Sequence, residues 1–226
     1  MSILDNILEI NDRIAKAALR AEKNFKDITL VAVTKTVDIQ DIFTAINCGI
    51  KITGENRIQE AKNKYEFVKD KVKLHFIGHL QKNKVREAVK MFDMIQSVDS
   101  LSLAQELSKE CEKQNKILDI LIEVKTSSEP AKFGMNPDEV KENLKEIIKL
   151  PELRLKGLMT IADFSEDLNR VRSCFTRLRK IKEELRYPEL IYLSMGMTND
   201  FEIAIEEGSN MVRIGSGIFK DLHLKC

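Results

Sequence analysis

The chain has 226 residues, with 37 basic and 36 acidic side chains and a formal net charge of +1. Hydrophobic residues make up 43% and charged residues 32%, which is typical of a globular protein with a sizeable core. Nucleic acids and anionic membranes select proteins with a basic excess, which this chain lacks. We therefore expect neither nucleic acid nor a membrane among its partners.

The cysteines and the N-terminal segment indicate the compartment. Cys48, Cys111, Cys174 and Cys226 stand far apart, and the chain has only three histidines. Such spacing predicts neither a metal site nor a disulfide framework, and free thiols fit a reducing cytoplasm. The N-terminus lacks the apolar stretch of a signal peptide, and no apolar run approaches the ~18 residues of a membrane span. The expected location is cytoplasmic.

Helical and strand-like segments alternate along the chain. Ile3, Ile7, Ile10 and Ile14 recur at the spacing of one helix face. Short apolar runs rich in β-branched residues then predict strands at about 29–33, 50–53, 73–77, 93–97, 118–124, 154–159, 190–193 and 210–214. Amphipathic patterns between them predict helices at 38–48, 58–69, 82–90, 101–113, 137–149 and 168–185.

This alternation predicts an α/β fold with a parallel sheet, because parallel neighbours need crossover connections. An open doubly wound sheet is one solution, but this many strands in this length favours a single (β/α)8 barrel of the TIM type. The chain ends soon after the last strand, so we expect the N-terminal helix to take the place of the missing eighth helix. No Pro-, Gly- or Ser-rich linker divides residues 1–226, which predicts one domain.

Glycines cluster where the predicted strands end. Gly54, Gly78, Gly196, Gly215 and Gly217 follow strands two, three, seven and eight. The carboxyl ends of barrel strands form the functional face, where glycine lets backbone amides approach a ligand closely. Each glycine taken singly is equally well explained as a turn residue.

Lys35 ends the first predicted strand, after LVAV and Thr34. A lysine partly shielded from water at a barrel mouth keeps more of its amine neutral, and the neutral amine attacks an aldehyde. The alternative is a solvated surface lysine, as most of the basic residues must be. Lys35 is therefore a candidate Schiff-base lysine.

The segments SMGMTND and MVRIGSGIF follow the last two strands, where barrels commonly bind phosphate through loop amides and a helix N-terminus. Hydroxyl and amide donors come from both segments: Ser194, Thr198, Ser216, Gly196, Gly215 and Gly217. Thr198 or Asn199 is also a candidate N-cap of a helix that runs into EIAIEEG. Capping and anion binding use the same end of a helix, so the two interpretations are compatible.

Other polar side chains are candidates to contact a bound ring. Arg213 is expected to point inward or toward the mouth, where its charge would keep a pyridine nitrogen unprotonated; pairing with a carboxylate such as Glu55 is the alternative. Asn56 and His79 follow strands two and three and are candidates to contact the ring or its lysine, although His79 could equally begin a helix. His75 is expected at the opposite end, in a structural role.

Six motifs, spread over almost the whole chain, resemble motifs of the pyridoxal phosphate homeostasis proteins and occur in the same order as in that family. They are AVTK at 32–35, TGENR at 53–57, HFIGHLQKNK at 75–84, LKGLM at 155–159, LSMGM at 193–197 and VRIGSGIF at 212–219. The resemblance implies a fold like the N-terminal barrel of alanine racemase, which is fold type III among enzymes that use pyridoxal 5'-phosphate (PLP). It also implies PLP as a Schiff base on Lys35, and an intracellular role in vitamin B6 homeostasis.

The resemblance also implies roles for single residues. Phosphate is expected on Ser194, Thr198, Gly215 and Ser216. Arg213 is expected to face the pyridine nitrogen, and Asn56 lies in the motif that flanks the cofactor. The chain departs from the family pattern at Arg57, where an aromatic residue is more usual, and at Thr198, where serine is usual and the hydroxyl is retained.

The sequence favours a PLP-binding carrier or regulator without strong catalytic activity, with PLP-dependent apo-enzymes as candidate recipients. A related racemase uses a catalytic tyrosine from a second domain, and Tyr65, Tyr187 and Tyr192 lie in no cofactor motif. One alternative is an amino-acid racemase with Lys35 and His79 as acid and base; another is a sugar-phosphate lyase or aldolase that uses Lys35 without PLP. The apolar helix faces are used by the barrel coat, so a monomer is expected.

Overall fold

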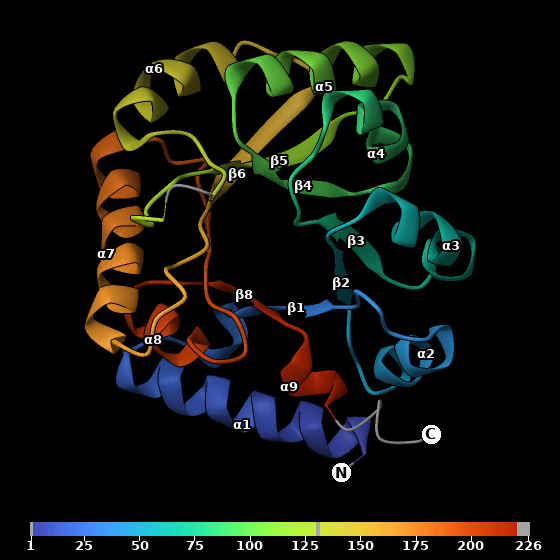
Figure 1. Ribbon diagram of the computed structural model, residues 1–226, viewed down its shortest axis with the longest axis vertical. Helices are drawn as coiled ribbons and strands as arrows, with labels where there is room; N and C mark the ends of the chain where they lie inside the picture. Colours follow the sequence, from blue (N-terminus) through green and yellow to red (C-terminus); the bar gives the residue numbers. More distant parts are fainter. Residues whose placement is uncertain (1, 130–131, 221–226) are drawn as a thin grey trace.

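The strands form a closed parallel barrel in which each strand pairs with its sequence neighbours and β8 pairs with β1 (Figure 1). The computed structural model describes residues 2–129 and 132–220, so Cys226 lies outside the described residues. The barrel strands are β1 Thr29–Val33, β2 Ile52–Glu55, β3 Lys73–Phe76, β4 Met94–Val98, β5 Leu118–Glu123, β6 Leu153–Met159, β7 Tyr192–Ser194 and β8 Met211–Ile214. The predicted (β/α)8 barrel of the TIM type is confirmed.

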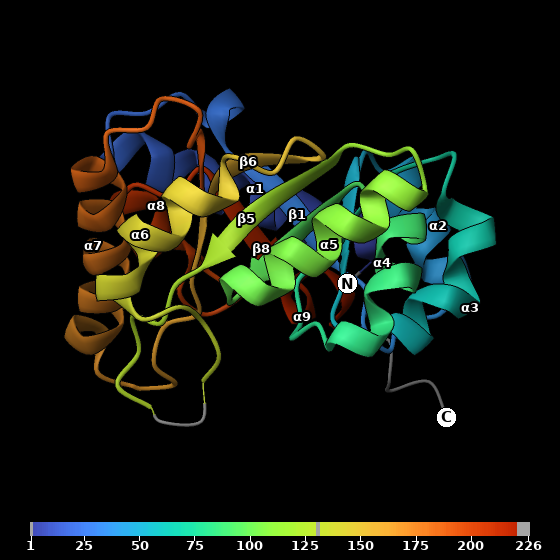
Figure 2. The same cartoon turned by 90° about the horizontal axis from the view of Figure 1, so that it is seen from above.

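Helices cover the outside of the barrel (Figures 1 and 2). They are α1 Ile3–Arg20, α2 Ile39–Asn47, α3 Ile58–Val68, α4 Val85–Met91, α5 Leu101–Lys113, α6 Pro137–Ile147, α7 Leu168–Leu185, α8 Phe201–Glu206 and α9 Ser216–Phe219. Short 3-10 turns occur at Phe25–Asp27 and Lys82–Lys84, and the second delays the start of α4 relative to its predicted position. In the described parts of the chain, no helix has both the length and the apolar character that crossing a membrane requires.

Helix α1 begins with a capping box, in which Ser2 Oγ accepts from the Asp5 amide at 3.1 Å and Asp5 Oδ2 accepts from the Ser2 amide at 2.9 Å. Its isoleucine face is buried with residues of β8, α8 and α9. Burial of each such side chain contributes about 1.5–3 kcal/mol. Helix α9, after β8, has only four residues, and α1 packs beside it and α8, as the sequence predicted.

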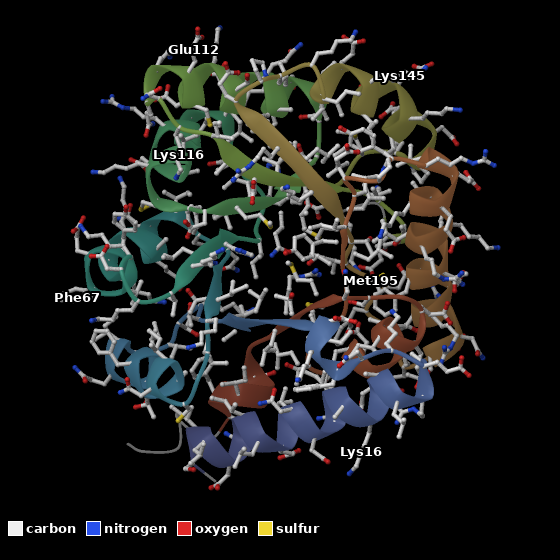
Figure 3. The ribbon with its side chains drawn as sticks, turned by 180° about the vertical axis from the view of Figure 1, so that it is seen from behind. Lys16, Phe67, Glu112, Lys116, Lys145 and Met195 are labelled. Carbon is white, nitrogen blue, oxygen red and sulfur yellow. The ribbon has the colours of Figure 1, made fainter. Side chains whose placement is uncertain are left out.

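Alternation along the strands separates two apolar layers, because consecutive side chains of a strand point to opposite faces. The inner layer is a cluster of strand residues: Val31, Met94, Leu121, Met159 and Met211. The outer layer packs the strands against the helices. Side chains fill the middle of the barrel, which is therefore a packed core rather than a pore (Figure 3). The described residues of the segments that follow β5 and β6 project beyond the strand ends (Figure 2).

Candidate functional site

Lys35 lies in the turn that follows β1, at the carboxyl end of the barrel, and its side chain is exposed. Thr36 adopts a left-handed backbone with φ of 59°, and its amide donates to Glu60 Oε2 of α3 at 3.0 Å. The turn is thus tied to α3 while the lysine amine stays accessible. The sequence predicted partial shielding from water; the structure differs because Lys35 lies beyond the last strand residue rather than inside the barrel.

The residue before Lys35 is anchored by a buried carboxylate. Glu55 accepts from Thr34 Oγ1 at 2.6 Å and from Lys64 Nζ of α3 at 2.9 Å, and Lys64 Nζ also donates to the Thr34 carbonyl at 2.6 Å. Gly54 lies within β2 on the inner face, so Glu55 points outward to α3. The alternative pairing of Glu55 with Arg213 is therefore wrong.

Asn56 follows β2 and is half-buried. A Cβ at Gly78 would lie 2.2 Å from the Asn56 carbonyl oxygen, so only glycine lets the end of β3 pack directly against the Asn56 backbone. Asn56 Oδ1 is buried, and no hydrogen-bond partner for it occurs among the described residues. A buried acceptor without a partner at the mouth of a barrel marks a position where a ligand donor would be stabilised.

Thr198 and Ser216, from the segments that follow β7 and β8, lie together. Ser216 Oγ donates to Thr198 Oγ1 at 3.1 Å, and the Gly217 amide donates to the same oxygen at 3.3 Å. Ser216 is exposed and begins α9, with Gly215 at the N-cap position. The structure therefore brings together three of the four residues that the resemblance implies for phosphate, with their hydroxyls at the start of a helix.

Ser194 does not join this group, because it lies inside the barrel with no exposed surface. Its Oγ accepts from Arg213 Nη1 at 2.7 Å and donates to Gln96 Oε1 at 2.6 Å. The predicted cap of α8 was also wrong: Asp200 is the N-cap residue, and its Oδ1 accepts from the Met197 amide at 2.5 Å. The Thr198 hydroxyl is left to contact α9 instead.

Gly196 explains how the chain turns between β7 and α8. Its φ of +97° lies in the left-handed region, and a Cβ there would stand 2.6 Å from Ala204 Cβ. Only glycine combines that backbone with such close packing. The turn carries Thr198 toward α9 while β7 keeps Ser194 inside.

Arg213 is buried in the barrel, below the mouth, with 3% of its surface exposed. Besides the bond to Ser194, its Nη2 donates to the Thr160 carbonyl at 2.8 Å. Burial lowers the pKa of Arg213 to about 10, while the charges of Asp200 and Glu123 act in the opposite direction. The guanidinium therefore remains positive at neutral pH.

Gln96 links Ser194 to two further residues inside the barrel. Its Nε2 lies 2.9 Å from His75 Nδ1 and 3.3 Å from Met211 Sδ. His75 is the third residue of β3 and lies inside the barrel, not at its opposite end as predicted, because alternation directs it inward. Burial lowers the pKa of His75 to about 3, so its ring is neutral. Sequence reasoning missed Gln96, whose only signal is a polar residue inside the apolar strand MIQSV.

His79 lies on the rim, where its Nδ1 is 3.0 Å from Asp99 Oδ2 and its ring stacks on Phe133 with 3.8 Å between centroids. Beside it is a pocket of about 160 Å³. The lining residues are Ile77, Gly78, His79, Glu123, Lys125, Ser127, Lys132, Phe133 and Ile161. The segment 132–137, predicted as a loop of the functional face, thus contributes two residues to this pocket.

Glu123, the last residue of β5, is a second group that sequence reasoning missed. Burial raises its pKa to about 7, and the charge of Asp99 acts in the same direction, while Arg213 opposes it. Burial also raises the pKa of Asp200. The mouth therefore contains a buried carboxyl group that exchanges a proton near neutral pH.

These contacts limit what the site can do. Within residues 2–129 and 132–220, no cluster of three His, Cys, Asp or Glu side chains could hold a metal ion. The barrel instead presents an accessible amine and hydroxyl groups at a helix start on the same face, around a buried cation. A site of this kind suits a phosphorylated carbonyl compound, which needs an amine for its carbonyl carbon and donors for its phosphate.

Comparison with known proteins agrees with this class. The family model of the alanine racemase N-terminal domain matches residues 9–223. The pyridoxal phosphate homeostasis protein of Aquifex aeolicus is 40% identical over 223 residues, which cover 97% of this chain and 98% of that protein. The chain belongs to the family of pyridoxal phosphate homeostasis proteins, as its motifs predicted.

Solved structures show the same relationship. PipY of Synechococcus elongatus, in a structure with PLP bound, is 32% identical with a TM-score of 0.81, and the match covers 93% of this chain and 99% of that chain. An alanine racemase of Clostridium difficile has a TM-score of 0.72 at 14% identity, covering 95% of this chain and 56% of that one. The second likeness shows a shared fold alone.

Proposed function

We propose that the protein binds PLP at the carboxyl end of the barrel, with the cofactor attached covalently to Lys35, and that it serves in PLP homeostasis. One observation carries the proposal: β1 pairs with β8, so the turn of Lys35 lies beside the segment of Gly215 and Ser216. A lysine amine and a helix start with hydroxyl and amide donors, which follow adjacent strands, would match the aldehyde and the phosphate of one small cofactor.

The chain's own groups fit PLP. Thr198 Oγ1, Ser216 Oγ and the first amides of α9 are the groups that would hold the phosphate. Asn56 Oδ1, a buried acceptor without a partner among the described residues, would be satisfied by a donor of the ligand or of Lys35. In this proposal Ser194 supports Arg213 instead of contacting the phosphate.

When bound, PLP supplies an aldehyde that bonds reversibly to amines and a ring that accepts electrons. Arg213 works against the second property, because its positive charge disfavours a proton on a pyridine nitrogen nearby. A protonated ring nitrogen makes the ring a stronger electron sink. The residues therefore favour holding the cofactor over using it in catalysis.

The tyrosines support the same interpretation. Tyr65 lies on α3, Tyr187 precedes β7 and Tyr192 is the first residue of β7, so all three lie away from the carboxyl-end mouth. In this proposal the protein acts as a carrier or regulator rather than as a racemase. We further propose that it is a monomer in the cytoplasm and that PLP-dependent apo-enzymes are its recipients. The free thiols of Cys48 and Cys174 fit a reducing compartment.

The test is to record the visible absorption spectrum of the purified protein with PLP, reduce it with borohydride and locate the adduct by peptide mass spectrometry. The expected adduct lies on Lys35 and disappears in Lys35→Ala. Lys16 is an exposed lysine on α1 (Figure 3), and the matched control Lys16→Ala should retain the adduct on Lys35. A protein that stays colourless and unmodified with added PLP would overturn the proposal and favour a sugar-phosphate lyase.

A further inference from the structure

A continuous row of buried hydrogen bonds crosses the barrel beneath the mouth. Arg213 of β8 bonds to Ser194 of β7 at 2.7 Å, Ser194 to Gln96 of β4 at 2.6 Å, and Gln96 to His75 of β3 at 2.9 Å. All four residues are buried. Polar groups in a barrel interior are costly unless each finds a partner, so a row of four marks an organised element of the site.

The chemistry of the groups sets one direction of donation. Arginine only donates, so Ser194 Oγ accepts from it and turns its own hydrogen toward Gln96 Oε1. The amide nitrogen of Gln96 then faces His75 Nδ1 and Met211 Sδ and donates to both. Because an amide nitrogen only donates, His75 Nδ1 must accept, which assigns the ring the tautomer with its proton on Nε2; burial keeps the ring neutral, as this tautomer requires. Each hydrogen bond in the row therefore has one possible donor and one possible acceptor.

Arg213 has competing partners. The charges of Asp200, which follows β7, and of Glu123, the last residue of β5, both favour the charged form of Arg213. A fully buried guanidinium without its neutral partners would gain by pairing with one of these carboxylates. The bonds to Ser194 and to the Thr160 carbonyl at 2.8 Å fix the orientation of the guanidinium and use two of its five N–H donors.

We propose that Gln96 is a positioning residue: through Ser194 it holds the Arg213 guanidinium in the orientation that contacts the PLP ring. This inference rests on the proposed binding of PLP. Gln96 acts two hydrogen bonds away from Arg213's contact with the ring. It sets where the positive charge stands, and hence whether the ring nitrogen stays unprotonated.

The test uses Gln96→Leu, which keeps the bulk and removes both polar ends of the side chain. Two quantities are measured: the dissociation constant for PLP, and the pH at which the absorption spectrum of the bound ring changes. We expect binding weaker by about tenfold or more, as for a lost contact to a charged group. The spectral transition should move to higher pH, because the ring nitrogen gains a proton more easily once the cation moves away. Met94→Leu, in the same interior layer, should change neither quantity.

Two further comparisons distinguish positioning of Arg213 by Gln96 from a purely structural role of Gln96 in the barrel core. If Gln96 acts through Arg213, Gln96→Leu adds nothing to Arg213→Met, whereas independent effects would add. Ser194→Thr and Ser194→Val have nearly the same shape and differ in the hydroxyl, so only the valine variant should shift the spectrum. This pair decides the question if Gln96→Leu does not fold.

Each outcome supports or overturns the inference. An unchanged spectrum and affinity in Gln96→Leu, or an equal effect of Ser194→Thr and Ser194→Val, overturns it while leaving PLP binding intact. A full additional loss in the double variant with Arg213→Met also overturns it. Wild-type protein that binds no PLP is a different result, which refutes the proposed function instead.

Discussion

Replacing Glu123 by glutamine should stabilise the protein in alkaline solution and hardly at all in acid. Glutamine keeps the shape of the side chain and cannot ionise. Burial raises the pKa of Glu123 from 4.5 to about 7, a difference of about 2.5 pH units. At about 1.36 kcal/mol per unit, ionising this carboxyl group in the folded protein costs about 3 kcal/mol.

The sign follows from proton linkage. Between pH 4.5 and 7 the folded state keeps a proton on Glu123 that the unfolded state has released, so folding stability falls as pH rises through this window. Above about pH 7 both states are ionised and the full penalty applies. The advantage of Glu123→Gln should therefore be about 3 kcal/mol at pH 8 and below about 1 kcal/mol at pH 5.

Urea denaturation of wild type and variant at both pH values measures this difference as free energies of unfolding. Glu112→Gln, an exposed change on α5 (Figure 3), is the control and should stay within about 0.5 kcal/mol of wild type at either pH. A gain for Glu123→Gln that is equal at pH 5 and pH 8, or no gain at either, would refute the reasoning, since a buried group with a raised pKa must produce the pH dependence.

Three other changes test the fold and the site. Ile10 lies on the buried face of α1 and is 1% exposed. Ile10→Ala should lower the free energy of unfolding, measured by urea denaturation, by about 2–5 kcal/mol, because it would leave a cavity in the apolar cluster that joins α1 to β8. Gly78→Ala should weaken PLP binding in an absorbance titration, since the new Cβ would force the Asn56 carbonyl, 2.2 Å away, to move; unchanged affinity would show that Asn56 is not at the ligand. Wild-type protein with PLP, incubated with L-alanine or L-serine, should form no more D-isomer than Lys35→Ala by chiral chromatography; a clear excess would favour the racemase alternative.

Two errors of the sequence reasoning concern the side of a strand on which a polar residue lies. Strand β2 was predicted at 50–53 and forms at 52–55, which turned Glu55 from a residue beyond the strand into its last, outward-facing member. His75 lies beside Gly54 in the register of β2 and β3, and so points into the barrel. Side chains alternate with a period of two, so the face that a polar group occupies depends on whether it belongs to the strand and on its register with the neighbouring strands, which a short motif does not give.

Ser194 illustrates a different limit. Its motif resembled a phosphate-binding segment, and its neighbour Thr198 does lie at the start of α9 with Ser216. Ser194, however, is the last residue of β7, and the barrel interior offered it Arg213 and Gln96. Nothing in a linear motif distinguishes a hydroxyl at the end of a strand from one in the turn after it.

The sequence by itself determined the order of helices and strands, the parallel barrel, the family and the candidate lysine, because these depend on local periodicity, crossover geometry and motifs within short segments. Tertiary structure alone decided which side chains meet. Closure of β1 on β8 placed the turn of Lys35 beside the segment of Gly215 and Ser216, and the fold assembled Arg213, Ser194, Gln96 and His75 into one buried row. The physical reason is that these contacts join residues from different strands, whose partners are chosen by barrel closure, strand register and burial rather than by their neighbours along the chain.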